Sequence, residues 1–80
     1  MSIMKLGVRH SQTGNSALME VDLKTRLQEL LDSAIEFWSL PSEAYLIKSG
    51  KRLLSASKTV AECGLNDGDI IDLLPDPEGG

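Results

Sequence analysis

Reactive and metal-binding side chains are scarce in this chain of 80 residues, which has one cysteine and one histidine. A single cysteine excludes an internal disulfide and any multi-cysteine metal site, so we expect no metal and no cofactor. Long apolar runs are missing too. None approaches the roughly 20 residues that cross a bilayer, and the N-terminus lacks the apolar core of a signal peptide. We therefore expect a cytoplasmic protein without a membrane partner.

Basic side chains are also few, because 8 Lys and Arg stand against 12 Asp and Glu and give a formal net charge of -4. The basic residues are scattered along the chain, whereas nucleic-acid binding needs clustered Lys and Arg that neutralise phosphates. Residues 66–80 are acidic without any Lys or Arg. We expect no nucleic-acid partner.

The residues for catalysis are missing as well. A catalytic nucleophile needs an adjacent base and a group that orients that base. His10 begins a segment of loop composition, and Cys63 lies in an apolar turn, where a small buried cysteine with a packing role is the commoner case. The sequence therefore predicts that the chain is not an enzyme and has no catalytic residue.

The first half of the chain has the periodicity of a hairpin followed by a helix. Residues 3–9 and 17–22 alternate between apolar and polar side chains, which predicts two half-buried strands joined by a loop over 10–16. From residue 25 the apolar residues recur at steps of three and four, which indicates an amphipathic helix that Pro41 ends. Its apolar stripe consists of Leu27, Leu30, Leu31, Ala34, Ile35 and Trp38.

The second half reads as three strands joined by turns. Residues 44–48 and 51–54 flank Ser49-Gly50, and the cluster Asn66-Asp67-Gly68-Asp69 is a strong turn signal before the apolar strand 70–74. Successive side chains of a strand point to opposite faces. With Leu46, Ile71 and Leu73 toward the helix, we expect Tyr45, Ile47, Asp72 and Leu74 to point outward.

Residues 40–74 resemble the second half of ubiquitin-like domains. The resemblance rests on the Gly50-Lys51 turn, the segment Thr59-Val60-x-Glu62-x-Gly64-Leu65 and the Asp67-Gly68-Asp69 turn before the last strand. It implies an α+β, β-grasp fold in residues 1–74, with a mixed sheet of four to five strands packed on one amphipathic helix. A flexible tail is expected over residues 75–80.

The chain ends in Gly79-Gly80, at the distance from the last strand that is found in ubiquitin. The resemblance implies a protein modifier whose Gly80 carboxylate is activated by an ATP-dependent, ubiquitin-activating-like enzyme. A conjugating enzyme would then join it to a target through an isopeptide bond, and a deconjugating protease would release it. Two glycines suit a narrow enzyme channel, since neither carries a Cβ.

The same resemblance implies further sites. The positions of Ile47 and Leu74 belong to the surface that partner domains bind in ubiquitin-like proteins, and we expect a partner-binding patch formed by these two residues and Tyr45. Lys51 stands where ubiquitin has a principal chain-linking lysine, so it is the candidate acceptor, although an exposed lysine is ordinary surface.

The approach to the terminal glycines departs from ubiquitin, because Pro75-Asp76-Pro77-Glu78 is acidic where ubiquitin is basic. The chain is therefore more similar to divergent bacterial ubiquitin-like modifiers that have dedicated enzymes. Two alternatives stay open. One is a non-covalent interaction module, similar to the accessory protein of bacterial type VII secretion. The other is a sulfur carrier that forms a C-terminal thiocarboxylate.

Overall fold

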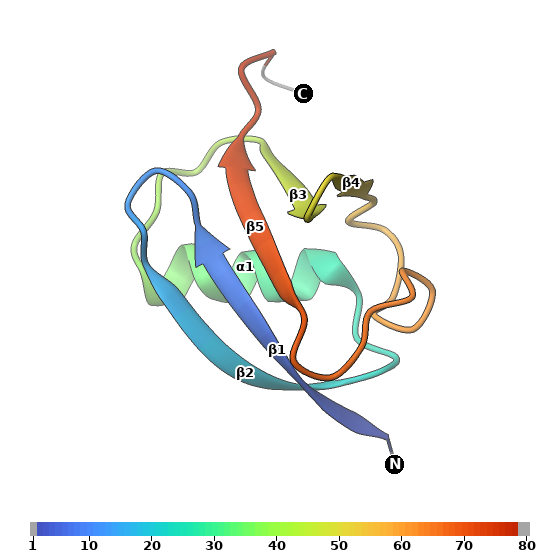
Figure 1. Ribbon diagram of the computed structural model, residues 1–80. Helices are drawn as coiled ribbons and strands as arrows, with labels where there is room; N and C mark the ends of the chain where they lie inside the picture. The colour runs from blue at the N-terminus through green and yellow to red at the C-terminus, as the bar shows by residue number, and fades with distance from the viewer. Residues whose placement is uncertain (1, 79–80) are drawn as a thin grey trace.

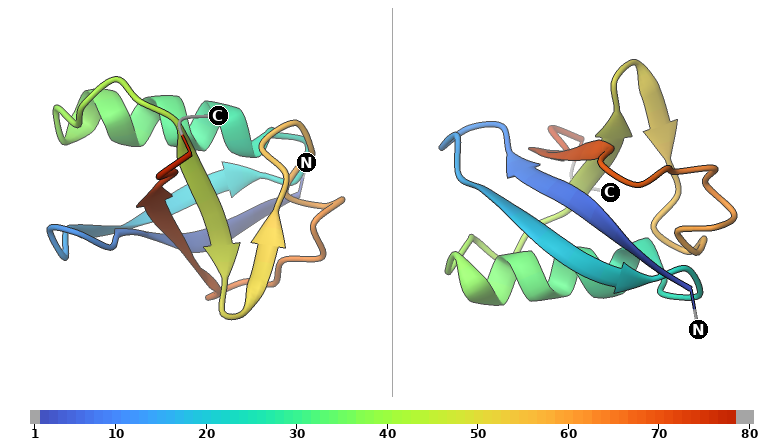
Figure 2. Two further views of the ribbon diagram at one scale, coloured as in Figure 1. Left: turned by 90° about the horizontal axis from the view of Figure 1, so that it is seen from above. Right: turned by 60° about the horizontal axis from the view of Figure 1, so that its bottom comes forward.

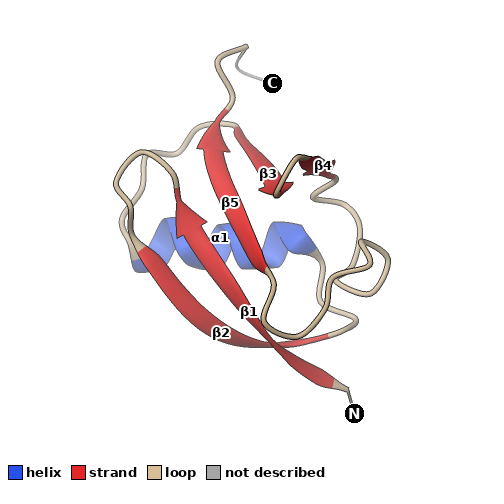
Figure 3. Ribbon diagram, in the orientation of Figure 1, coloured by secondary structure: helices blue, strands red, loops and turns tan. Residues whose placement is uncertain are grey.

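One helix packs across one face of a five-stranded sheet in the computed structural model, which describes residues 2–78. The strands lie in the order β2-β1-β5-β3-β4; β1 and β5 are parallel, and all other neighbours are antiparallel. The predicted mixed sheet on a single helix is confirmed (Figures 1 and 3). The elements are β1 (Ile3–His10), β2 (Ser16–Asp22), α1 (Leu27–Phe37), β3 (Tyr45–Ser49), β4 (Arg52–Leu54) and β5 (Ile70–Pro75).

Both views of Figure 2 show α1 lying over one face of the sheet, and most of the core side chains come from these two layers. Alternate residues of the adjacent strands β1 and β5 are buried there, and they meet the apolar stripe of the helix. This stripe has the width expected for a helix that covers one sheet face. The largest fully buried side chains are Leu6, Val8, Leu27, Ile47, Val60, Ile71 and Leu73. No helix among residues 2–78 is long and apolar enough to cross a membrane.

Strand β3 faces the opposite way from the prediction. Ile47 is only 2% exposed and pairs with buried Leu73, whereas Leu46 pairs with Leu74 and both are half-buried. Paired residues of antiparallel strands share a face, so the register with β5 turns Ile47 into the core. The outward placements of Ile47 and Tyr45 and the inward placement of Leu46 were therefore wrong. Tyr45 packs against the core.

Strand β1 continues through His10, which was expected in a loop. His10 lies on the same side as the buried Met4, Leu6 and Val8, and it is 2% exposed. Its Nδ1 lies 2.9 Å from the Thr13 hydroxyl, and its Nε2 has no hydrogen-bond partner among the described residues. The alternation of inward and outward side chains along β1 therefore determines where His10 points, although the side chain is polar.

Strand β5 also ends later than predicted. Pro75 belongs to the strand and pairs with Tyr45, and the Asp76 N–H donates to the Ala44 carbonyl at 2.8 Å. A proline is compatible with the end of a strand because no N–H is needed from it there. Beyond Asp76 the chain leaves the sheet at the top of Figure 1. The predictions for Gly79 and Gly80 lie outside the described residues.

Candidate functional site

The exit of the chain from β5 is the first part of the candidate site. Pro77 and Glu78 are exposed, and the Glu78 N–H donates to Asp76 Oδ1 at 3.0 Å, which gives this segment a local turn. The last ladder contact with the sheet is the one that Asp76 makes to Ala44. An acidic segment therefore leaves the sheet directly before the sequence Gly79-Gly80.

The second part is the sheet face opposite the helix. Its side chains alternate with the buried ones along each strand, and several of them are apolar and well exposed, including Leu18 at 67% and Ile70 at 54%. We call this face the outer sheet surface. Its members are Ile3, Lys5, Arg9, Leu18, Glu20, Leu46, Lys48, Leu53, Ile70, Asp72 and Leu74.

Charges divide the outer sheet surface into two apolar regions. Arg9 and Lys48 both pair with Asp72 in the strand register, and Arg9 Nε donates to Asp72 Oδ1 at 2.6 Å. Leu46 and Leu74 lie next to each other on one side of this charged row.

Of the predicted patch, therefore, only Leu74 lies on this surface, and its apolar neighbour is Leu46. The pairing of Leu46 with Leu74 places it on this face, and the β3 sequence offers one matching signal, the charged Lys48 two residues later on the same side.

Lys51 lies at the tip of the β3–β4 hairpin. Gly50, which precedes it, has φ of 61°, a left-handed conformation that glycine adopts without a Cβ clash. Lys51 is exposed in this two-residue turn. Its ammonium is accessible to an enzyme, but accessibility is shared with other surface lysines, so its role as an acceptor stays a prediction.

The Cys63 thiol is poorly suited to covalent chemistry. The residue is 7% exposed within the apolar cluster, and burial raises the pKa of its thiol, which disfavours the nucleophilic thiolate. The Arg52 guanidinium donates to the Cys63 carbonyl oxygen at 3.0 Å and thereby joins this segment to β4. Within residues 2–78 there is no group of three His, Cys, Asp or Glu side chains that could hold a metal ion.

No model of a known protein family matches the chain, and no curated protein matches it. Solved structures do. The ubiquitin of Caldiarchaeum subterraneum has a TM-score of 0.81 at 21% identity, covering 99% of this chain and 100% of that one. A protein designed on the basis of ubiquitin has a TM-score of 0.82 at 19% identity, covering 96% and 93%. The UBL domain of Plasmodium falciparum Dsk2 has a TM-score of 0.77 at 16% identity, covering 94% and 100%.

These similarities extend over nearly the whole of each chain. They confirm the predicted ubiquitin-like β-grasp fold at a level of sequence identity that marks the chain as divergent. Because a fold supports many functions, what the chain does has to be argued from its surfaces and its tail.

Proposed function

We propose that this ubiquitin-like chain is a protein modifier, whose Gly80 carboxylate is activated by an ATP-dependent enzyme and then joined to target proteins. The observation that supports this most strongly is the path of the chain after β5. The last strand of a ubiquitin-like fold leads through Asp76 into the exposed residues Pro77 and Glu78, and the sequence continues with two glycines. A slender segment of this kind can enter an enzyme channel while the folded domain remains outside.

The proposed chemistry proceeds by four displacements. The Gly80 carboxylate attacks the α-phosphorus of ATP, and pyrophosphate leaves as an acyl-adenylate forms. A cysteine thiolate of the activating enzyme attacks the acyl carbon, AMP leaves, and a thioester forms. The thiolate of a conjugating enzyme attacks this thioester, and the thiolate of the activating enzyme leaves. A target amine then attacks the new thioester, the thiolate of the conjugating enzyme leaves, and an amide forms as the amine loses a proton. In each step this chain is the substrate, and the enzymes supply the catalytic groups.

The acidic approach to the glycines supports a dedicated set of enzymes. Asp76 and Glu78 present carboxylates where an enzyme adapted to a basic tail would be repelled. An activating enzyme and a deconjugating protease for this chain should instead present Lys or Arg along the channel. This charge preference separates the chain from ubiquitin in a cell that contains both.

The outer sheet surface is the proposed docking site for these enzymes. Leu46 and Leu74 form an apolar pair close to the tail exit, since Leu74 is adjacent to Pro75 at the end of β5. Neighbouring apolar residues on an uncovered sheet face are typical of a protein-binding surface. In this proposal Tyr45 and Ile47 support the surface from the core side, and Lys51 is a candidate acceptor at its edge.

The proposal is tested by incubating the chain with its activating enzyme and ATP. The full chain should form an enzyme adduct that hydroxylamine or a reducing thiol releases, and deletion of Gly80 should abolish it. The Leu46→Ser variant should fold and form the adduct more slowly, whereas Lys51→Arg should leave the adduct unchanged. An adduct of the same yield after deletion of Gly80 would show that the carboxylate is not the reacting group.

A non-covalent interaction module is the second candidate. It is favoured by the similarity to the UBL domain of P. falciparum Dsk2, which is a domain rather than a free modifier by its description. In that case the outer sheet surface would carry the function alone. Truncation after Asp76 would leave partner binding intact, while Leu46→Ser would weaken it.

A further inference from the structure

The chain at the end of β5 is held at more points than a free linker would be. Pro75 still belongs to the strand, and the Asp76 N–H donates to the Ala44 carbonyl oxygen at 2.8 Å. Two residues further on, the Glu78 N–H donates to Asp76 Oδ1 at 3.0 Å. An aspartate oxygen that accepts from the N–H two residues later forms an Asx turn. We call residues 75–78 the tail arm.

Proline restricts the tail arm further. The ring of Pro77 fixes φ at about −65° in the middle of the turn, and a residue before proline is driven to extended backbone, which keeps Asp76 in line with β5. An aspartate followed by a proline also favours the start of a turn. In Figure 1 the residues after Asp76 curve away from the line of β5. The sequence and the hydrogen bonds therefore favour the same bent conformation.

The backbone that holds Asp76 is itself fixed to the core. Ala44 precedes Tyr45, whose hydroxyl donates to the Pro41 carbonyl oxygen at 2.9 Å. The Tyr45 ring packs against the core, and its centroid lies 6.1 Å from that of the buried His10 ring. The carbonyl that accepts from the Asp76 N–H is therefore part of a rigid support.

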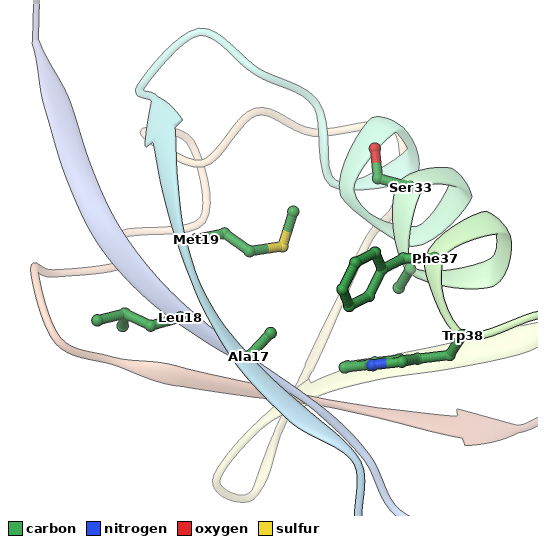
Figure 4. A pocket seen from close by; sticks show the side chains of 7 residues that line it. Ala17, Leu18, Met19, Ser33, Phe37 and Trp38 are labelled. Atoms are coloured by element: carbon green, nitrogen blue, oxygen red, sulfur yellow. The ribbon is translucent and has the colours of Figure 1, made fainter.

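The end of α1 fixes the start of this support. Ser39 has φ of 52°, and the Leu40 N–H donates to the Ile35 carbonyl oxygen at 2.9 Å, as in a Schellman motif. Figure 4 shows the Trp38 ring directed from the end of α1 toward Ala17 of β2, and Trp38 packs against the core. The segment between the helix and β3 therefore starts from a fixed point.

The Asp76 side chain closes the turn and keeps one oxygen free. Asp76 is half-buried, whereas Pro77 and Glu78 are exposed. In the described part of the chain, Oδ1 accepts from the Glu78 N–H, and no ion pair or side-chain hydrogen bond engages Oδ2. A Lys or Arg of a partner can therefore pair with Oδ2 while the turn stays closed.

The turn determines how much of the tail can extend from the domain. Without it, residues 76–80 could straighten over about 17 Å, at about 3.4 Å for each residue. With it, only Gly79 and Gly80 remain beyond the turn, and two extended residues span about 7 Å. An enzyme that accepts the closed turn must therefore reach the Gly80 carboxylate close to the domain, near Leu46 and Leu74.

We propose that Asp76 is a positioning residue, which holds the tail arm so that enzymes bind the turn, the Leu46 and Leu74 pair and the glycines as one preformed surface. This proposal rests on the proposed activation of Gly80, and Asp76 acts through the turn without touching the reacting atoms. A preformed surface binds with a smaller ordering cost than a mobile one, and a reacting group that is held in place reacts faster. The activating enzyme and the protease should therefore have a shallow entrance that accepts a bent tail, with a Lys or Arg that pairs with Asp76 Oδ2.

The tail arm is tested first in the free chain, labelled with ¹⁵N. The ¹⁵N heteronuclear NOE of Glu78 should lie well above its value in a labelled synthetic peptide of residues 74–80, which lacks Ala44. Asp76→Asn keeps the accepting oxygen and should keep this order. Asp76→Glu keeps the charge, places its oxygens one methylene further from the backbone, and should lose the order. Phe37→Ser is the distal control; it changes an exposed ring at the end of α1 and should leave the NOE of Glu78 unchanged.

The same variants are then compared in cells that produce the chain, each with an N-terminal epitope tag and in place of the native protein. Asp76→Glu should give at least fivefold fewer higher-mass conjugates than Asp76→Asn, because the fraction of chains with the tail arm in place limits the reaction. Glu78→Gln removes one charge and keeps the backbone N–H of the turn, so it measures the effect of charge alone. The yield from Asp76→Asn should lie within about twofold of it, since one exposed charge contributes little. The chain without Gly80 is the negative control.

Three results would overturn the proposal. They are a Glu78 NOE in the chain equal to that in the peptide, equal conjugate yields from Asp76→Asn and Asp76→Glu, and a higher yield from Asp76→Glu, which would mean that the turn restrains the tail. If the yields are equal and deletion of Gly80 still abolishes the conjugates, the proposed function stands without the positioning role. If the wild type forms no conjugates, the proposed function fails, and the positioning role fails with it whatever the NOE shows.

Discussion

The two faces of the sheet are both rich in aliphatic residues, yet they differ in what covers them. On the inner face Leu6, Val8 and Ile71 are fully buried under α1. On the outer face Leu18 and Ile70 remain exposed, and no other element among the described residues packs over that face (Figure 2). Composition alone therefore does not distinguish the core face from the surface face. The position of α1 determines which face is buried. The inner face stabilises the fold, and the outer face is available to partners.

The largest difference between the two faces is expected in β3, where adjacent residues point in opposite directions. Ile47→Ala should lower the free energy of unfolding by about 3 kcal/mol, because it leaves a cavity in the core. Leu46→Ala should lower it by less than about 1 kcal/mol, since that side chain is half-buried on the outer face. Urea unfolding of both variants measures the contrast. Equal costs, or a larger cost at Leu46, would mean that the register of β3 against β5 is different.

His10 offers an intermediate test of the inner face. Its buried Nε2 lacks a partner among the described residues, and an unsatisfied buried polar atom costs about 1–3 kcal/mol. His10→Leu keeps a side chain of suitable size and removes that atom, so the free energy of unfolding should rise by about 1 kcal/mol. Thermal and urea unfolding at neutral pH check this. A loss of stability would show that the imidazole makes a contact that the fold requires.

The ion pair on the outer sheet surface should contribute less. Arg9 is more than half exposed where it pairs with Asp72, and exposed pairs contribute between about 0 and 1 kcal/mol. Arg9→Ala should therefore change the free energy of unfolding by less than about 1 kcal/mol, and the change should shrink at high salt. Urea unfolding at low and high ionic strength is the measurement. A larger loss of free energy of unfolding that does not depend on salt would mean that this pair stabilises the fold as a buried contact does.

The smallest effect is expected at Glu62, an exposed residue in the segment between β4 and β5. The Thr59 backbone N–H donates to Glu62 Oε1 at 2.9 Å, and this bond, with help from the Thr59 hydroxyl, lowers the pKa of the Glu62 carboxyl. A lowered folded-state pKa contributes stability above the unfolded-state pKa, and this contribution is lost as the pH falls through the folded-state pKa. The wild type should thus lose slightly more stability than Glu62→Gln on acidification. Urea unfolding of both proteins at several pH values measures this. The same dependence of the free energy of unfolding on pH in both proteins would contradict the linkage.

Most elements of the fold could be predicted from the sequence because their local signals agree. The hairpin of β1 and β2 alternates, α1 has a long apolar stripe, and glycines mark the turns that precede Lys51 and β5. The errors arose where a local pattern is ambiguous. Tyr45, Leu46 and Ile47 are all apolar, so within β3 only Lys48 marks the outer side, and pairing with β5 sets the orientation.

The candidate site was predictable in part. Leu74 was assigned to the correct face because it alternates with the buried Leu73 along β5. His10 was missed although it continues the inward series of β1 at every second residue, since its segment has the composition of a loop. The exposed Phe37 was missed because it falls beside the apolar stripe of the helix. An aromatic residue next to the stripe, at the end of an otherwise acidic helix, was the available signal.

The proposed activation of Gly80 is tested most directly by mass spectrometry of conjugates from cells that produce the chain. The last basic residue is Lys58, so trypsin would leave residues 59–80 on a target, whereas a glutamate-specific protease that cleaves after Glu78 would leave only Gly79-Gly80. We predict lysines of other proteins that carry this diglycine, and their loss when Gly80 is deleted. Recovery of the free chain alone, from cells that are using it, would contradict a covalent modifier.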